Sequence, residues 1–302
     1  MDTGGLLVGT AGWSFPDWEG VVYPRGAGRS GKALGLMART FDVMEINVSF
    51  YRPILSSMAR SWLDAVAAFP AFRFTAKLWR GFTHEREETH EPERAAWLEG
   101  IAPLREAARL GAVLAQFPIS FRNTAPSRAY LESLLDRFAE LPLVVELRHV
   151  SWMTDEVIAM LTARQVGWCN VDQPLLGDAV PPSTMVTSPV AYVRLHGRNR
   201  TEWFRKDAGR DARYDYLYSE EEIDEWALRI GLMRQRAPGA VTFIIANNHY
   251  RGQAAVNALE LKSALTGGPV EVPDLLLSAY PRLARVSARS GRAPGGQAPL
   301  PL

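Results

Sequence analysis

Leu-Val-Val-Glu-Leu-Arg-His-Val-Ser-Trp, residues 143–152, is the stretch that decides the fold. It begins as an apolar, β-branched run, which is typical of a buried strand, and it ends in polar side chains. Charged groups at the end of a buried strand indicate that the strand delivers them to a site. Because strand side chains alternate, Glu146 and Arg148 share one face and are the predicted site residues, whereas His149 lies just beyond the strand and is expected to brace a loop.

Similar apolar runs recur along the chain, with helical periodicity between them. The predicted strands are residues 6–11, 43–50, 72–78, 112–117, the opening stretch, 166–171, 191–195 and 241–246. The predicted helices are residues 32–40, 56–68, 94–109, 127–139, 154–164, 220–235 and 252–265. Ser127 and Ser219 are the expected N-caps of two of these helices. Eight alternations of strand and helix predict an α/β protein with a single (β/α)8 TIM barrel.

A doubly wound open sheet shares this alternation and is the main competing architecture. The barrel is favoured because eight strands are expected, no glycine-rich phosphate fingerprint follows the first, and no change in composition marks a second domain. We therefore expect one barrel domain over residues 1–286, with a long polar loop after the seventh strand. Residues 287–302 carry too little apolar surface to pack and are expected to form a flexible, disordered tail.

The composition is that of an ordinary soluble globular protein. Of the 302 residues, 47% are hydrophobic and 22% are charged, and the formal net charge of +1 gives no overall field that favours nucleic acid. Cys169 is the single cysteine, so an intramolecular disulfide is excluded and a reducing compartment fits. The N-terminus does not have the pattern of a signal peptide, and no stretch approaches the ~20 apolar residues of a membrane helix. We expect a cytoplasmic protein that does not bind membranes.

In a TIM barrel the active site forms at the carboxyl ends of the strands, so the residues there are the candidates for function. Lys77, Arg148 and Arg194 come from three strands and are expected to hold an anionic group. Glu146 and His196 are the predicted proton-transfer residues, because imidazole titrates near neutrality and burial can raise the pKa of a carboxylate. The other candidates are Glu45, Asp172, Asn247 and Asn248, expected to orient hydroxyl groups or water, and Gln116, expected to bind substrate.

Structural pairing competes with a binding role for each of these residues. Buried charges need partners, and Arg148 and Arg194 could simply neutralise Glu146 and Glu45. Taken as a set, however, the polar strand ends favour a ligand site.

Aromatic and histidine residues in the loops give weaker signals. Trp13 and Tyr51 follow strand ends and are candidates for stacking on a sugar or base, although such residues more often fill gaps between loops and barrel. His84 and His90 lie in an acidic polar loop, which we expect to be solvated rather than functional.

Two other kinds of function stay open. Glu45, Glu146, Asp172 and His196 offer the ligands of a divalent metal, as in a metal-dependent phosphodiesterase or nuclease acting on nucleic acid. No local motif supports such a centre and nearby cations oppose it, so no cofactor is predicted. Residues 198–213 mix basic and aromatic side chains in a way that could contact nucleic acid, but their aspartates favour a self-paired loop. A non-catalytic ligand- or nucleic-acid-binding protein is the other alternative.

The strand ends also resemble a known family. The matching blocks, in chain order, are Gly-Thr-Ala-Gly-Trp-Ser (9–14), Glu-Ile-Asn with Phe-Tyr-Arg-Pro (45–53), Lys77 with Thr83-His84, Gln116-Phe117-Pro118, Glu-Leu-Arg-His-Val-Ser-Trp (146–152), Asp172 with Pro174, Tyr-Val-Arg-Leu-His-Gly (192–197) and Asn247-Asn248. They resemble the YecE-like family of uncharacterised TIM-barrel proteins, catalogued as domain of unknown function seventy-two. The resemblance spans residues 8 to about 262 and implies the barrel fold, but it implies no reaction, cofactor or catalytic residue. The chain departs from the family pattern at Ala11, where serine is common, and before Asn247, where an aromatic residue is common.

Together these observations predict an enzyme that uses acid-base chemistry on a small anionic or sugar-like substrate. The anionic group of that substrate is expected to be a phosphate or a carboxylate, bound at the C-terminal mouth of the barrel.

Overall fold

In the computed structural model, which describes residues 5–28, 31–86, 91–202, 205 and 212–288, parallel strands close into an eight-membered barrel. The strands are β1 (Leu6–Ala11), β2 (Val43–Ile46), β3 (Arg73–Lys77), β4 (Leu110–Gln116), β5 (Leu143–Glu146), β6 (Gly167–Asp172), β7 (Val190–Leu195) and β8 (Val241–Ala246). Each strand pairs with its neighbours in sequence, and β8 closes the ring against β1. The predicted (β/α)8 barrel is confirmed.

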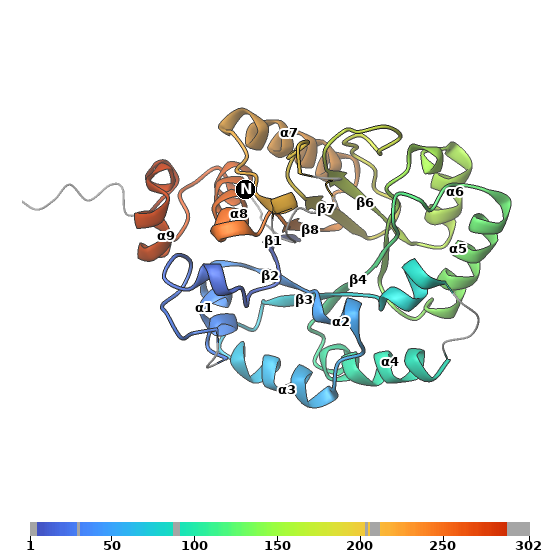
Figure 1. The fold of residues 1–302 in the computed structure, drawn as a ribbon, viewed down its shortest axis with the longest axis horizontal. Coiled ribbons are helices and arrows are strands. Elements are labelled where there is room, and N and C mark those ends of the chain that lie inside the picture. Colours follow the sequence, from blue (N-terminus) through green and yellow to red (C-terminus); the bar gives the residue numbers. More distant parts are fainter. Residues whose placement is uncertain (1–4, 29–30, 87–90, 203–204, 206–211, 289–302) are drawn as a thin grey trace, which may run out of the picture.

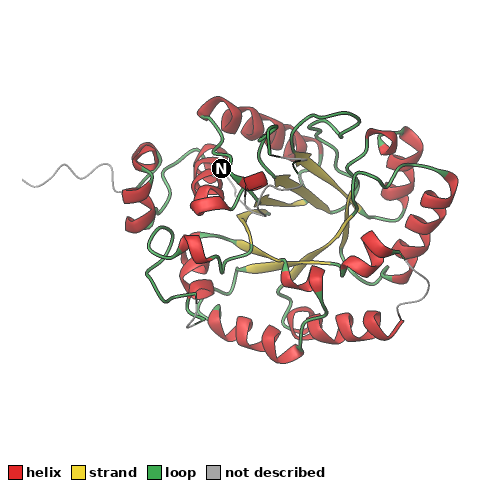
Figure 2. Ribbon diagram, in the orientation of Figure 1, coloured by secondary structure: helices red, strands yellow, loops and turns green. Residues whose placement is uncertain are grey.

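Helices surround this barrel (Figure 1, Figure 2). They are α1 (Ala33–Thr40), α2 (Val48–Tyr51), α3 (Ser56–Ala65), α4 (Glu91–Glu106), α5 (Ala125–Arg137), α6 (Asp155–Ala163), α7 (Glu220–Arg236), α8 (Gln253–Thr266) and α9 (Asp274–Ala279). The expected N-cap at Ser219 is confirmed: its side chain accepts from the amide of Glu222, which returns a bond from its own carboxylate. Of the helices in the described ranges, none combines the length and apolar character needed to cross a bilayer.

The strands are apolar because helices cover one face and the lumen the other. All four residues of β5 are buried. Across the lumen, Thr75 Oγ1 of β3 lies 2.8 Å from Tyr192 Oη of β7, which identifies the inward faces of these two strands. Because the side-chain period of a strand is two, Lys77 and Arg194 occupy the same inner faces, one step nearer the carboxyl ends. The lumen therefore carries a polar layer at its C-terminal mouth.

The second strand is shorter than predicted. Residues 43–50 read as one alternating strand, but β2 ends at Ile46 and the chain turns into helix α2. Ser49 explains the turn, because its hydroxyl lies 2.9 Å from the carbonyl oxygen of Ile46 and 2.8 Å from that of Lys77. A serine that bonds to nearby backbone competes with continued strand pairing.

The predicted N-cap at Ser127 is wrong. Helix α5 begins at Ala125, and its N-cap is Thr124, whose side chain accepts from the backbone amide of Ser127. Pro126 lies in the first turn, where a missing amide hydrogen costs nothing, so the helix starts earlier than the apolar periodicity indicates.

The described chain stays packed up to its last residues. Ser287 is 3% exposed and forms an isolated bridge with Val270, so packing extends just past the predicted domain boundary at residue 286. Residues 289–302 of the predicted tail lie outside the described residues. The same holds for 203–204 and 206–211 in the predicted long loop, which does follow β7.

Candidate active site at the barrel mouth

Arg194 of β7 is the centre of the polar layer. Its Nη2 donates to Glu45 Oε1 at 2.7 Å and its Nη1 to Glu146 Oε2 at 2.6 Å, and all three side chains are buried. Burial opposes the charge of Arg194, but the two carboxylates outweigh it and raise its pKa well above the ordinary value. The expectation that Arg194 holds a substrate anion is not supported, because both of its terminal nitrogens bond to the carboxylates of Glu45 and Glu146.

Glu146 of β5 also binds the guanidinium of a second arginine, Arg148. Its Oε1 accepts from Arg148 Nε at 2.6 Å. Burial would raise the pKa of Glu146, but Arg148 and Arg194 outweigh burial and hold that pKa well below its usual range. The expectation of a raised pKa is wrong, and Glu146 stays ionised near neutral pH. It holds Arg148 in place instead of exchanging protons.

His196 follows β7 and is completely buried. Its Nδ1 lies 2.8 Å from Asn247 Nδ2, and its Nε2 lies 3.3 Å from Glu146 Oε1. Because an amide nitrogen donates, Nδ1 accepts and Nε2 carries the proton toward the carboxylate. Burial lowers the pKa of His196 to about 3 despite Glu146, so the imidazole is neutral at pH 7. The expectation that it titrates near neutrality is wrong, although its position in the site is as predicted.

Lys77, the last residue of β3, differs from its neighbours because its partner is uncharged. Its Nζ donates to Gln116 Oε1 at 2.7 Å, and Arg194 Nη1 donates to the same oxygen at 3.2 Å. Among the described residues no carboxylate forms an ion pair with Lys77. Burial and then the charge of Arg194 lower the pKa of Lys77 to about 7, although Glu45 and Glu146 act in the opposite direction.

His84 lies beside the candidate site, although the sequence predicted it in a solvated loop. Its ring is half-buried, packs edge-on against Phe50 with centroids 5.0 Å apart, and has Nδ1 2.9 Å from Thr83 Oγ1. Burial, followed by the charges of Lys77 and Arg148, lowers the pKa of His84 to about 4. The Thr83-His84 pair within the family-like blocks was the signal that could have identified it. His90 lies outside the described residues.

Two guanidinium groups near His84 add positive charge to the mouth. Arg148 is 17% exposed, and its Nη2 lies 3.3 Å from His196 Nε2. Arg86 also acts on the pKa of His84, and its guanidinium lies 5.0 Å from the ring centroid of Phe121. Its Nη1 is buried without a hydrogen-bond partner in the described structure. An unsatisfied buried donor of this kind favours an anionic ligand.

Asp172 does not join this group, contrary to expectation. Its carboxylate accepts from Arg198 Nε at 2.9 Å and from Trp226 Nε1 of α7 at 2.9 Å. Cys169 of the same strand faces the lumen, with Sγ 4.0 Å from Glu146 Oε2. Asp172 is three residues further on, so the alternation of β6 turns it toward the helices. Reading the strand ends from the sequence overlooked this change of face.

The two asparagines after β8 likewise separate. Asn247 contacts His196, whereas Asn248 Nδ2 donates to the carbonyl of Tyr216 and to Asn257 Oδ1 of α8, both at 2.8 Å. The substrate role predicted for Asn248 is therefore corrected, because its amide fixes the loop before α7 to α8.

Of the two predicted stacking aromatics, Trp13 packs outside the polar layer, whereas Tyr51 packs edge to face with Phe50, the ring that lies over Lys77 Nζ. Trp13 packs edge-on against Trp62 of α3, with ring centroids 5.4 Å apart, and it contacts Phe74 on the outer face of β3. Tyr51 is 63% exposed. His149 is a loop brace as predicted, because its Nδ1 accepts from the amide of Ser151 and caps the turn that follows β5.

The four predicted metal ligands are not assembled. Arg194 lies between Glu45 and Glu146, and Asp172 faces the helices. Within the described parts of the chain, no group of three or more His, Cys, Asp or Glu side chains could hold a metal ion. The alternative metal-dependent mechanism thus loses its proposed ligand set.

The basic loop after β7 is self-paired where it is described. Arg198 binds Asp172 and also contacts Glu222 at 3.0 Å and Glu225 at 3.2 Å. Arg205 contacts Glu202 at 3.1 Å. Trp203, Phe204 and residues 206–211 of the predicted nucleic-acid patch lie outside the described residues.

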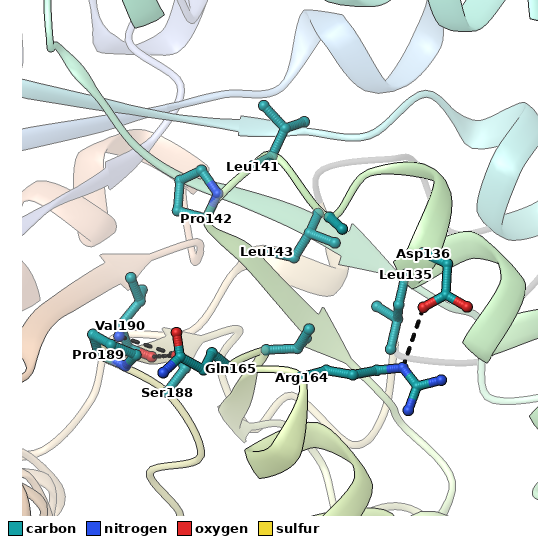
Figure 3. Close-up of a pocket in the computed structure, with 12 residues that line it drawn as sticks. Leu135, Asp136, Leu141, Pro142, Leu143, Arg164, Gln165, Ser188, Pro189 and Val190 are labelled. Atoms are coloured by element: carbon teal, nitrogen blue, oxygen red, sulfur yellow. Dashed lines mark hydrogen bonds and ion pairs between the residues drawn. The ribbon is translucent and has the colours of Figure 1, made fainter.

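A hollow of about 440 Å³ lies at the opposite, amino-terminal end of the strands. Its lining includes Leu143 and Val190, the first residues of β5 and β7 (Figure 3). Arg164 points toward Asp136 there, 3.4 Å away, and both side chains are partly or largely exposed. Because this hollow gathers no buried titratable groups, the mouth is the better candidate for chemistry.

Comparison with known proteins agrees with this fold. Residues 7–278 match the family model described as "Protein of unknown function DUF72". The chain is 26% identical over 276 residues to the UPF0759 protein YunF of Bacillus subtilis, covering 86% of this chain and 94% of that protein. A solved DUF72 family structure from Thermotoga maritima shares 35% identity with a TM-score of 0.76, covering 86% of this chain and 99% of that one. One from Enterococcus faecalis shares 28% identity with a TM-score of 0.73, covering 86% and 95%. The chain therefore belongs to the DUF72 family.

Proposed function

We propose that this protein is an enzyme that transfers a proton on a small anionic substrate bound at the barrel mouth, with Lys77 as the general base. One observation carries the proposal: the Lys77 amine is buried beside Arg194, bonds to the neutral oxygen of Gln116, and has a pKa of about 7. A base is most effective when its pKa lies near the working pH, because it is then both available and strong.

The charges around Lys77 support an anionic substrate. Arg194 and Arg148 together balance the carboxylates of Glu45 and Glu146, and Arg86 adds a further cation beside the half-buried His84. Guanidinium groups match the oxygen atoms of phosphate and carboxylate. Arg148 is the predicted primary anchor, because it is held by Glu146 and still reaches solvent. A phosphate- or carboxylate-bearing sugar or oxo acid has the required chemistry.

Glu146 and His196 then have supporting roles. Both are buried, and neither changes its protonation state near neutral pH. Glu146 stays ionised because its pKa lies well below its usual range, and His196 stays neutral because its pKa is about 3. The carboxylate of Glu146 keeps Arg148 and Arg194 in position, and the neutral Nε2–H of His196 is directed toward the same carboxylate. Proton transfer therefore moves from this pair, where the sequence placed it, to Lys77.

Hydrogen exchange tests this function even while the product is unidentified. The protein is incubated in D2O with small phosphate- and carboxylate-bearing sugars and oxo acids, and loss of carbon-bound hydrogen is followed by proton NMR. In parallel, each compound is tested for its effect on the melting temperature. We expect at least one compound to raise the melting temperature and to exchange a hydrogen next to its carbonyl group.

Variants separate an enzyme from a binding protein. Lys77→Met is expected to abolish exchange and retain binding, whereas Arg148→Met is expected to weaken binding by about 10- to 100-fold, the value of a charge-assisted hydrogen bond. Asp172→Asn, on the helix side of the wall, serves as the control and should retain both. Binding without exchange would leave a non-catalytic protein as the correct description, and exchange that survives in Lys77→Met would refute the role of Lys77.

A further inference from the structure

The chain has four lysines, Lys32, Lys77, Lys206 and Lys262, and Lys77 stands apart from the others that the structure describes. Lys32 is exposed before α1, and Lys262 of α8 forms an ion pair with Asp42 at 2.9 Å. Lys77 is 7% exposed and lies at the carboxyl end of β3, on the face toward the lumen. Its setting therefore differs in burial and in the charge of its partner.

The Lys77 amine is prepared to act as a nucleophile by its neighbours. Gln116 Oε1 accepts from both Lys77 and Arg194, so two basic groups share one uncharged oxygen. Arg194 keeps its proton because Glu45 and Glu146 clamp it. The proton that relieves the repulsion must therefore leave Lys77, and a desolvated lysine beside a second cation is the arrangement that activates amines for attack on carbonyl carbon.

The surroundings of Nζ also favour condensation. The Phe50 ring of α2 lies with its centroid 4.2 Å from Nζ, and the edge of this ring contacts His84. An aromatic wall of this kind limits water near the nitrogen, which favours loss of water over its return. Arg148, whose charge acts on Lys77, is available for an anionic group on the same molecule.

We propose that Lys77 Nζ forms an imine with an aldehyde or ketone that also carries a phosphate or carboxylate group. The nitrogen bonds to the carbonyl carbon, the carbonyl oxygen takes up the two amine hydrogens and leaves as water, and no oxidant or reductant is consumed. This inference rests on the proposed function and narrows its substrate to carbonyl compounds. While its nitrogen is bonded to the carbonyl carbon, Lys77 acts by withdrawing electrons from the adjacent carbon and not as the base. The hydrogen released there is accepted as a proton by water or by the neutral imidazole of His84.

Borohydride trapping tests the proposal directly. The whole protein is incubated at pH 7.5 with glycolaldehyde phosphate, pyruvate or uncharged glycolaldehyde, then reduced and measured by intact mass. A reduced imine is a stable secondary amine, and trypsin does not cleave after a modified lysine, so an adduct at Lys77 remains on the peptide of residues 74–80. We expect one adduct per chain on this peptide with at least one anionic probe.

Control variants fix the site and the role of the anion. Lys77→Met should lose the adduct, and Lys262→Met should keep it. In Arg148→Met the probe concentration for half-maximal trapping should rise by about 10- to 100-fold for the anionic probes and change little for glycolaldehyde. Preference for glycolaldehyde phosphate or for pyruvate shows which anion the mouth recognises. Circular dichroism confirms folding of each variant.

Two outcomes would overturn the imine. One is an adduct distributed over the lysines and unchanged in Lys77→Met, which indicates random surface reaction. The other is no adduct at Lys77 with any probe at saturating concentration. If hydrogen exchange still depends on Lys77 in that case, the proposed proton transfer stands and the imine alone is refuted.

Discussion

The barrel wall near β6 and β7 separates two charge clusters, each built on one arginine. The inner cluster, Glu45, Glu146 and Arg194, is buried in the lumen, and the outer cluster, Asp172, Arg198, Glu222 and Glu225, is partly exposed and lies toward α7. The guanidinium joins two carboxylates in the inner cluster and three in the outer cluster. The outer cluster is closed by further partners, including the indole of Trp226. The inner cluster has Lys77 at its border, bonded to a neutral amide.

This difference shows that buried charge at a strand end does not by itself identify a catalytic group. The pKa of Asp172 is raised by burial even though Arg198 opposes the shift, yet every described contact of its carboxylate is structural. Lys77 is distinguished by an incomplete set of partners rather than by its burial. Function is therefore expected where a charge cluster leaves a titratable group without an opposite charge.

The largest expected effect is loss of the inner guanidinium. Arg194→Met leaves Glu45 and Glu146 buried without their shared partner, which is expected to lower the free energy of unfolding by about 3–5 kcal/mol. Urea denaturation followed by circular dichroism measures it. Arg198→Met in the outer cluster is the matched control and should cost less, because Arg198 is 26% exposed. Equal losses for the two variants would contradict the distinction between the clusters.

Removing the outer carboxylate separates stability from binding. Asp172→Asn weakens two hydrogen bonds to a buried group and is expected to lower the free energy of unfolding by about 1–3 kcal/mol. Affinity for the anion found in the exchange experiment, measured by calorimetry, should change by less than about twofold, which corresponds to less than RT. Glu146→Gln should weaken that affinity because it releases Arg148. A larger affinity loss in Asp172→Asn than in Glu146→Gln would contradict a binding site in the barrel lumen and would place it instead between the barrel and α7.

Lys77 predicts a distinctive pH dependence of stability. Its pKa is about 7 in the folded protein against an ordinary 10.5, because burial and Arg194 oppose its charge while Glu45 and Glu146 only partly compensate. Between pH 7 and 10 the unfolded chain holds more protons at this position, so the free energy of unfolding should rise with pH. Below pH 7 both states are protonated and the contribution is constant.

Lys77→Met should flatten this rise, whereas Lys262→Met should leave it unchanged. Urea denaturation of the three proteins at pH 7, 8, 9 and 10 provides the comparison. A slope that persists in Lys77→Met would assign the titration to another group.

The smallest expected effect is at His84. Its ring is half-buried, and burial with Lys77 and Arg148 lowers its pKa to about 4, so it is neutral at pH 7. His84→Gln keeps a neutral donor and should change the free energy of unfolding by less than about 0.5 kcal/mol. His84→Ala should weaken anion binding by about 2- to 10-fold, the value of one neutral hydrogen bond. Unchanged affinity in His84→Ala would remove His84 from the site.

The sequence predicted the fold well because strand burial and helix periodicity are local signals. Leu6–Ala11 and Val241–Ala246 form strands over the ranges expected from the apolar runs. The early end of β2 depends partly on a distant contact, because Ser49 bonds to the carbonyl oxygen of Lys77 as well as to that of Ile46. The start of α5 was misplaced by a local feature, the capping side chain of Thr124.

Several of the residues predicted at the strand ends lie together, but their partners and protonation states differ from the expectation. Strand ends correctly placed Glu45, Lys77, Gln116, Glu146 and His196 together. Which face Asp172 takes depends on the register of β6, and the protonation of His196 depends on burial by residues from other strands. These are tertiary properties, so the sequence alone did not predict the orientation of Asp172 or the neutral state of His196.

Both proposed roles of Lys77 require that its amine loses a proton near neutral pH, and NMR can measure this protonation state directly. Because the chain has only four lysines, a spectrum of the 15N-lysine-labelled protein contains few signals. The Nζ signal of Lys77 is the one that is missing from the spectrum of Lys77→Met. A pH titration from 5 to 11 should show this Nζ changing protonation at about pH 7. A Lys77 midpoint near the ordinary value of 10.5 would contradict both the general base and the imine.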